Sequence, residues 1–117
     1  MKDVLATINF GDNAIERLTS MATTQKRPLY AAEYWSGWFT LWGDKQMSRH
    51  TISKFAQNYE DIIFKMNSSV NIYMFEGGTN FGFMNGASGL QKNGHSHSVV
   101  TSYDYDAPLT EAGQTLF

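Results

Sequence analysis

The sequence predicts an α/β fold in which parallel strands alternate with helices. Three apolar, strand-like segments lie at residues 4–10, 28–34 and 69–75, and a helix-like pattern separates each from the next. Strands that are joined through a helix pair in parallel, with right-handed crossovers. Such a succession suits one half of a doubly wound sheet or a section of a (β/α)-barrel, and the pattern leaves that choice open. In both folds, catalytic groups gather at the carboxyl ends of the strands.

The first strand and helix are predicted near the N-terminus. The segment from Val4 to Phe10 is apolar with little alternation, which is typical of a buried parallel strand. Asp12 or Asn13 is placed to cap the following helix, and Glu16 lies three residues after Asn13, which is a capping-box spacing. The apolar side of this helix is expected to carry Ile15, Leu18 and Met21.

The strongest helical periodicity runs from Arg49 to Met66. Apolar residues recur there at spacings of three and four, so they are predicted to share one face. Ser48 is placed to cap the helix, and Asp61 and Lys65 form a favourable i, i+4 pair. The predicted face consists of Ile52, Phe55, Ala56, Tyr59, Ile62, Ile63 and Met66.

Composition excludes several classes of function. A chain of 117 residues is one domain at most, and a net charge of −2 without a basic run makes nucleic acid an unsuitable partner. No apolar stretch approaches the roughly 20 residues that a membrane span needs. The N-terminal residues lack the apolar core of a signal peptide, so no route into the secretory pathway is expected from them. The absence of cysteine excludes disulfides and thiolate metal sites.

The chemically informative segment begins where the second strand ends, at Glu33. This carboxylate is followed by aromatic residues in Glu33-Tyr34-Trp35-Ser36-Gly37-Trp38. A carboxylate among aromatic rings is typical of a sugar site, because it can attack or stabilise an oxocarbenium-like centre while the rings pack on the apolar side of a pyranose. From the pattern alone, the preferred interpretation of Glu33 is a strand-end acid in a loop ion pair, and catalysis is the alternative. Two further blocks follow, at residues 71–81 and 101–107.

These three blocks, in this order, resemble the family 35 glycoside hydrolases, the β-galactosidase family. The shared features are the Glu-aromatic block with the Trp42-Gly43 pair, the run Asn71 to Phe81, and the run Thr101 to Ala107. The resemblance implies a TIM-type (β/α)8 barrel, of which residues 1–117 would form strands six to eight and the following loop. It covers nearly the whole chain but only the last part of that catalytic domain, so a fragment of an enzyme is expected.

The resemblance also implies a role for individual residues. Glu33 corresponds to the nucleophile of a retaining β-galactosidase, which releases terminal β-galactose from glycans. Trp35 stands where many members have tyrosine. No metal or organic cofactor is implied, the partner is a β-galactoside, and members act in lysosomes or outside the cell. The residues implied to contact the sugar or shape its pocket are Tyr73, Tyr103, Tyr105, Trp35 and Tyr34.

One catalytic group is missing from the sequence. Retention requires a second carboxylate about 5–5.5 Å from the nucleophile, acting as acid and then as base. The family carries it in an Asn-Glu pair, and no such dipeptide occurs here. The isolated chain is therefore expected to be inactive, and a non-catalytic galactose-binding polypeptide or pseudoenzyme is the alternative interpretation. Glu76, at the end of the third strand, is a candidate substitute acid because its strand neighbours that of Glu33, but a surface or supporting carboxylate is the preferred interpretation.

Three other patterns are not taken as catalytic or binding sites. The Gly77-Gly78-Thr79 turn resembles a phosphate-binding turn only superficially, because no Gly-Lys-Ser/Thr or Gly-x-Gly-x-x-Gly motif accompanies it. His95 and His97 are two metal-ligand types without a third positioned ligand, so a solvated pair is expected. Asn67-Ser68-Ser69 is a glycosylation sequon that matters only in the secretory route.

Overall fold

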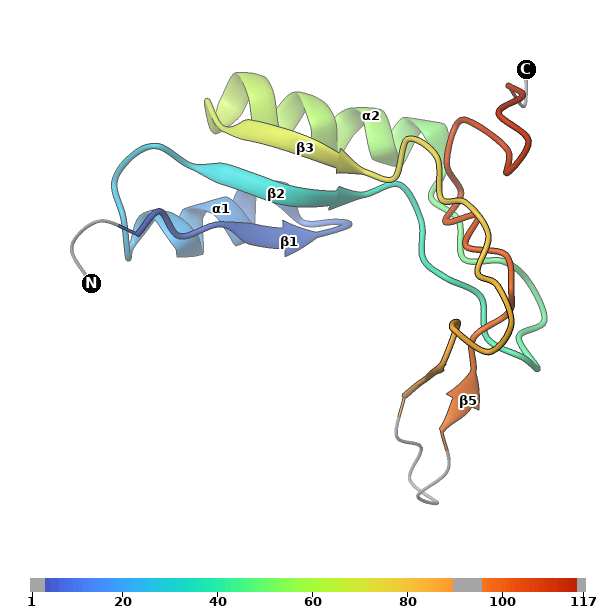
Figure 1. Cartoon of the computed structure of the whole chain (residues 1–117). Coiled ribbons are helices and arrows are strands. Elements are labelled where there is room, and N and C mark those ends of the chain that lie inside the picture. The colour runs from blue at the N-terminus through green and yellow to red at the C-terminus, as the bar shows by residue number, and fades with distance from the viewer. Residues whose placement is uncertain (1–3, 90–95, 116–117) are drawn as a thin grey trace. The chain divides into compact units, whose positions relative to one another are not determined.

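The computed structural model describes residues 4–89 and 96–115 (Figure 1). The chain divides into two compact units. The first, Met1–Ser36 with His50–Tyr73, contains the parallel sheet and is called the sheet unit. The second, Gly37–Arg49 with Met74–Phe117, consists mainly of loops and is called the loop unit. Each unit is described by itself below.

The sheet unit contains three parallel strands in the order β1-β2-β3. One helix follows β1, and a second helix, which continues into a π-helical turn, precedes β3 (Figure 1). This arrangement confirms the predicted α/β class and the parallel pairing, although no closed barrel forms within the described part of the chain. The elements are β1 (Ile8–Phe10), α1 (Ala14–Ala22), β2 (Tyr30–Trp35), α2 (Ile52–Glu60), the π-helical turn η1 (Asp61–Lys65) and β3 (Ser69–Tyr73).

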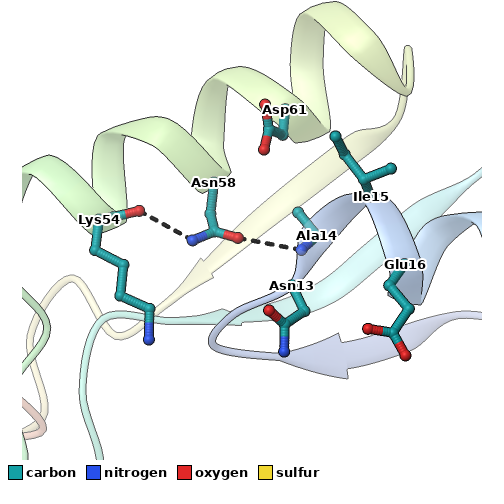
Figure 2. Close-up of a pocket in the computed structure, with 7 residues that line it drawn as sticks. All are labelled: Asn13, Ala14, Ile15, Glu16, Lys54, Asn58 and Asp61. Carbon is teal, nitrogen blue, oxygen red and sulfur yellow. Dashed lines mark hydrogen bonds between the residues drawn. The ribbon is translucent and has the colours of Figure 1, made fainter.

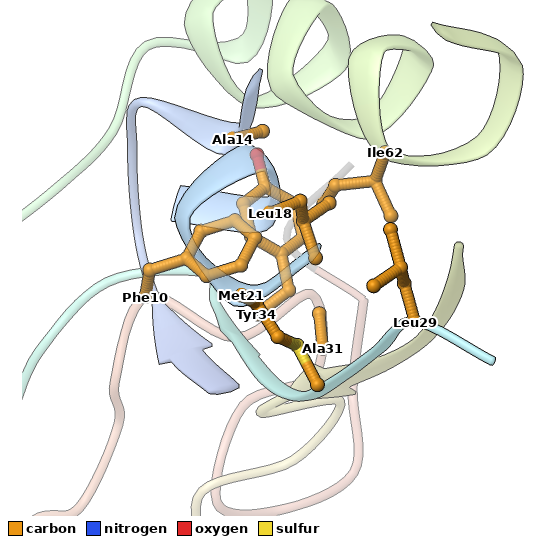
Figure 3. Packing of buried hydrophobic residues seen from close by; sticks show 8 residues of the cluster. All are labelled: Phe10, Ala14, Leu18, Met21, Leu29, Ala31, Tyr34 and Ile62. Carbon is orange, nitrogen blue, oxygen red and sulfur yellow. The ribbon is translucent and has the colours of Figure 1, made fainter. Parts of the chain in front are cut away.

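The core of the sheet unit lies between the sheet and its helices. Figure 3 shows side chains of α1, of η1 and of the strands converging on one cluster. Leu18 from α1 and Ile62 from η1 are 0% exposed. Full burial of such a side chain stabilises the fold by about 1.5–3 kcal/mol, so this cluster fixes the sheet against its helices. Its members are Phe10, Ala14, Leu18, Met21, Leu29, Ala31, Tyr34 and Ile62.

Two predictions for the N-terminal segment are wrong. The first strand is shorter than predicted, because Val4 and Leu5 lie before β1 with exposed fractions of 66% and 46%. In α1, Ile15 faces solvent, and Ala14 takes the inward position together with Leu18 and Met21. The spacing 14, 18, 21 points one helical face at the sheet, and Ile15 lies a quarter-turn away from it.

The start of the second helix also differs from the prediction. Thr51, not Ser48, is the N-cap of α2, and its hydroxyl accepts a hydrogen bond of 3.2 Å from the Lys54 backbone N–H. The first turn is then exposed, since Ile52 is 78% exposed. Ala56 and Tyr59 are exposed as well, so the predicted face is wrong at three of its seven positions.

The inward face is built instead on Phe55 and Asn58 of α2 and on Ile62 of η1. Asn58 is only 8% exposed, because both ends of its amide are used: Nδ2 donates to the Lys54 carbonyl at 3.0 Å, and Oδ1 accepts from the Ala14 backbone N–H at 3.1 Å. A polar residue thus occupies an inward position that an apolar pattern cannot reveal. The predicted pair of Asp61 with Lys65 is confirmed at 2.6 Å.

The loop unit confirms the predicted loop-rich C-terminal part. Its regular structure is a short antiparallel pair, β4 (Ala87–Ser88) with β5 (His97–Ser98), and isolated bridges join other segments, such as Thr79 to Ser102. Among the helices of both units that the structure describes, none has the length and apolarity required to cross a membrane.

Candidate active site

A β-bulge in β2 determines where the Glu33 side chain points. Ile8 and Asn9 of β1 pair with Ala31 and Glu33, so β2 holds one extra residue, Ala32, between two consecutive partners. The register between β2 and β3 also shifts between Ala31 and Tyr34, where three steps along β2 correspond to two along β3. Bulges of this kind re-aim side chains next to active sites.

After the bulge, Glu33 and Tyr34 point to opposite faces of the sheet; the face that carries Glu33 is called the site face. Phe10 and Tyr34 pair in register and both belong to the core cluster on the helix side. The preceding pair, Asn9 with Glu33, therefore lies on the opposite face of the sheet, since successive side chains alternate. Glu33 is half-buried and lies near the carboxyl end of its strand, which is where parallel α/β folds hold catalytic groups.

Trp35 is the direct partner of the Glu33 carboxylate. Its indole Nε1–H donates to Glu33 Oε2 at 2.9 Å, and both side chains are half-buried. On the adjacent strand Tyr73 pairs with Trp35, which places Tyr73 on the same face. Asn71 supports the bulge itself, because its Nδ2 donates to the Ala32 carbonyl at 3.1 Å. The structure thus brings three predicted site residues together: Glu33, Trp35 and Tyr73.

Tyr34 does not lie beside Glu33. It is 0% exposed in the core, its ring stacks on Phe55 with centroids 4.7 Å apart, and its hydroxyl donates to the Phe55 carbonyl at 2.7 Å. Burial raises the pKa of the Tyr34 phenol well above its usual range, and the charges of Asp12 and Asp61 add to this increase. Its side chain serves the packing of α2 on the sheet, because the bulge turns residue 34 toward the helices.

The remaining predicted pocket residues lie in the loop unit, where they form an aromatic cluster. The rings of Tyr103 and Tyr105 stack with centroids 5.0 Å apart. Trp38 lies 5.7 Å from Tyr105, and Phe39 lies 6.3 Å from Tyr103, both measured between ring centroids. Tyr105 is 2% exposed, whereas Trp38 is 38% exposed. The structure therefore brings both predicted tyrosines together and adds two rings to them.

A tight turn fixes this aromatic cluster. Tyr105 and Asp106 both have positive φ angles, 60° and 54°, and the Asp104 carboxylate accepts a hydrogen bond of 3.0 Å from the Asp106 backbone N–H. Glycine is required where other segments approach this turn: a Cβ on Gly37 would lie 2.6 Å from the Tyr105 carbonyl oxygen, and one on Gly77 would lie 1.5 Å from that of Tyr103. Gly37 and Gly77, from the first two sequence blocks, thus allow their backbones to pack closely against the third block, Thr101 to Ala107.

The interpretations of the histidines and of the glycine-rich turn can be compared with the structure in part. His97 Nδ1 lies 3.2 Å from the Trp42 carbonyl oxygen, whereas His95 lies outside the described residues. Within residues 4–89 and 96–115, no group of three His, Cys, Asp or Glu side chains could hold a metal ion. The Gly77-Gly78 turn packs against Tyr103, whose backbone N–H donates to the Gly78 carbonyl at 2.9 Å.

A separate hollow lies on the helix side of the sheet unit. It encloses about 400 Å³ between the start of α1 and α2, and Figure 2 shows Asn58 bridging its two walls. Glu33 lies on the opposite face of the sheet, so this hollow is distinct from the site. Its lining residues are Asn13, Ala14, Ile15, Glu16, Lys54, Asn58 and Asp61.

Comparison with known proteins supports the resemblance found in the sequence. The family described as Glycosyl hydrolases family 35 matches residues 1–116. The chain belongs to glycosyl hydrolase family 35. This family 35 chain is 46% identical over 119 residues to beta-galactosidase-1-like protein 3 of Homo sapiens, a match that covers 96% of the chain and 16% of the relative.

Other relatives carry related names. Identity is 40% over 121 residues with beta-galactosidase 1 of Dictyostelium discoideum, covering 98% of the chain and 18% of that protein. It is 41% over 121 residues with a beta-galactosidase of Xanthomonas manihotis, covering 97% and 19%. The family 35 chain therefore spans less than a fifth of the length of these relatives.

Three residues of the site face were not singled out from the sequence as site residues. Asn9 pairs with Glu33, Asn71 holds the bulge, and Gly11 lies against Trp35. Asn9 and Asn71 could have been found from the sequence, because each is an asparagine inside a mostly apolar strand segment. Such a residue indicates a strand face that is not packed in the core. The role of Gly11 depends on cross-strand register, which the sequence does not display.

Proposed function

We propose that the polypeptide carrying these residues is a retaining β-galactosidase-type glycoside hydrolase, with Glu33 as its nucleophile. The observation that carries the proposal is the Glu33 carboxylate at the end of a parallel strand, on the face away from the helices, with one oxygen held by Trp35. Membership of family 35 supports the reaction class, and the names of the relatives support a terminal β-galactose as substrate.

The reaction assigns Glu33 one bond to make. Its carboxylate attacks the anomeric carbon, forming a glycosyl ester as the bond to the leaving oxygen breaks, and water later hydrolyses that ester. The leaving oxygen needs a proton from a second carboxylate. None of the 117 residues matches the family's Asn-Glu pair. We therefore expect the 117-residue chain alone to fail with galactosides whose leaving groups require protonation.

Several aromatic residues are proposed to bind the sugar. In the sheet unit these are Trp35 and Tyr73, which share the face of Glu33. In the loop unit Tyr103 is proposed to pack on the pyranose, and the 2% exposed Tyr105, which stacks on it, is proposed to hold its ring in place. Tyr34 is left out because its side chain is buried in the core. The strands β1, β2 and β3 are proposed to be strands six to eight of a TIM-type barrel.

A trapping experiment tests the nucleophile. The reagent is 2-deoxy-2-fluoro-β-galactosyl fluoride, whose fluoride leaves without help from an acid, and whose fluorosugar slows hydrolysis of the ester. The polypeptide purified from its source is incubated with the reagent and digested with a protease. The masses of the resulting peptides are then measured by mass spectrometry. We expect the fluorogalactosyl group on the peptide containing Glu33, and none after Glu33→Gln. Glu76→Gln is the matched control, and a label elsewhere would exclude Glu33 as the nucleophile.

A second function is supported by the aromatic cluster of the loop unit. Four stacked or tilted rings, Trp38, Phe39, Tyr103 and Tyr105, form a surface of the type that binds sugars without chemistry. The 117-residue chain would then be a galactose-binding polypeptide. Calorimetric titration with millimolar galactose should release heat, and the heat should fall after Trp38→Ala. A titration without heat would argue against this function.

A further inference from the structure

We infer that Trp35 is a positioning residue for the nucleophile, and that Gly11 provides the space in which its indole adopts the required orientation. This inference rests on the proposed role of Glu33. It assigns to Trp35 an action on the carboxylate itself, in addition to any contact with the sugar, and it assigns a function to Gly11.

The hydrogen bond between Trp35 and Glu33 fixes one carboxylate oxygen. An indole N–H is only a donor, and a distance of 2.9 Å to Oε2 is the normal length for such a bond. Hydrogen bonds to a charged acceptor are the stronger kind, and half-burial of both side chains limits competition from water. The bond from Trp35 occupies Oε2, so we assign Oε1 as the attacking oxygen.

The register of the sheet explains how the indole reaches this position. Trp35 follows Glu33 by two residues and therefore shares its face. On β3 the neighbour of Trp35 is Tyr73, whereas on the β1 side the pair Phe10–Tyr34 places Gly11 next to it. Gly11 has no side chain, so the indole is free to lie over that position.

The space at Gly11 is closed on two sides. A Cβ at this position would lie 2.9 Å from His50 Nε2, 3.4 Å from Trp35 Cε3 and 3.5 Å from Trp35 Cβ. The first distance is shorter than side-chain contacts allow, and the second is tight. An added methyl group must therefore displace the imidazole, the indole or both. Because a hydrogen bond weakens steeply once its angle falls below about 120°, a sufficient rotation of the indole weakens its hold on the Glu33 carboxylate.

The two possible roles of Trp35 predict different kinetics of trapping. A residue that orients the attacking oxygen changes the rate constant of ester formation at saturating reagent, because alignment acts on the chemical step. A residue that only holds the ring changes the concentration of reagent needed for half-maximal rate. The two effects are separated in one set of time courses.

The experiment uses the purified polypeptide and the fluorogalactosyl fluoride. We expect Trp35→Phe to lower the saturating rate of labelling at Glu33 by about tenfold to a hundredfold, with an unchanged half-saturating concentration. Trp35→Tyr, which restores a polar donor on an aromatic ring, should recover most of the rate. Gly11→Ala should be slow like Trp35→Phe. Gly113→Ala controls for the general effect of replacing a glycine, because its methyl group meets no atom within 4 Å and its φ of 74° strains the backbone without crowding a side chain.

The outcomes separate this inference from the proposed function. Full-rate labelling of Trp35→Phe, or a change confined to the half-saturating concentration, overturns the positioning role and leaves Glu33 as nucleophile. If Glu33 is not labelled in the unsubstituted polypeptide, the proposed function fails. In that case the hydrogen bond itself is tested by proton–nitrogen NMR of the indole N–H groups of Trp35, Trp38 and Trp42. We expect Glu33→Gln to shift the Trp35 signal and to leave the other two unchanged. An unmoved Trp35 signal overturns the inference.

Discussion

Replacement of Asn58 by alanine should destabilise the sheet unit, because this one amide joins two helices. Asn58 Oδ1 accepts from the Ala14 N–H at 3.1 Å, and Nδ2 donates to the Lys54 carbonyl at 3.0 Å. Ala14 is 1% exposed, so water cannot readily replace the lost acceptor at the start of α1. A lost N-cap and a buried unpaired N–H together cost about 2 kcal/mol in the free energy of unfolding.

Urea denaturation followed by far-ultraviolet circular dichroism measures this loss. With a slope of about 1–2 kcal/mol per molar urea, a loss of about 2 kcal/mol should lower the transition midpoint of Asn58→Ala by about 1–2 M. Asn58→Asp retains the acceptor and places a negative charge at the start of α1, so its loss should be smaller, under about 1 kcal/mol. The slope should be the same in all variants.

The control distinguishes the tertiary cap from the local one that the sequence suggests. Asn13 is the N-cap residue of α1, but its side chain forms no cap hydrogen bond and its φ is 55°. Asn13→Gly removes the side chain without strain, so it should be neutral or slightly stabilising. Equal stability of Asn58→Ala and the parent, or a large loss in Asn13→Gly, would refute the reasoning.

Three further outcomes are expected. Gly77→Ala should disrupt the loop unit by more than about 3 kcal/mol, seen as lost near-ultraviolet dichroism, because its Cβ would meet the Tyr103 carbonyl oxygen at 1.5 Å. The raised pKa of Tyr34 stabilises the fold fully below its ordinary value of 10.0 and progressively less above it, so alkaline melting temperatures should fall less steeply in Tyr34→Phe. A hydrogen bond from Lys65 lowers the pKa of Asp61, so its contribution to the free energy of unfolding is present above the ordinary value of 3.8 and is lost as pH falls. In acid melting curves, Lys65→Met should abolish this pH-dependent loss.

Each of these outcomes has a contrary result. Native near-ultraviolet dichroism in Gly77→Ala would show that the close approach to Tyr103 is not needed. Gly113→Ala, whose methyl group meets no atom within 4 Å but whose φ is 74°, measures the effect of backbone strain alone. Identical alkaline transitions in Tyr34→Phe and the parent would exclude a role for the buried phenol. Identical acid transitions after Lys65→Met would mean that the Asp61 pair is too screened to contribute, as exposed pairs often are.

The sequence blocks predicted which strand residues share a face better than apolar spacing predicted the helix faces. Glu33, Trp35 and Tyr73 were assigned from sequence blocks, and the structure places all three on one face of the sheet. Ile15 and Ile52 were assigned to buried faces and are exposed. Apolar spacing shows that a helix has a face but fixes its rotation poorly when a polar residue points inward, and here an asparagine does so because its amide is fully bonded.

The sequence by itself determined the order of elements, the parallel pairing and the strand-end carboxylate, because these depend on local periodicity and on residue types. Only the tertiary structure decided that Ala32 is an extra residue in β2, that Tyr34 turns into the core and that Trp35 holds Glu33. These features depend on which residues stand opposite each other on neighbouring strands. Register between strands is set by side chains far apart in the chain, so no local pattern contains it.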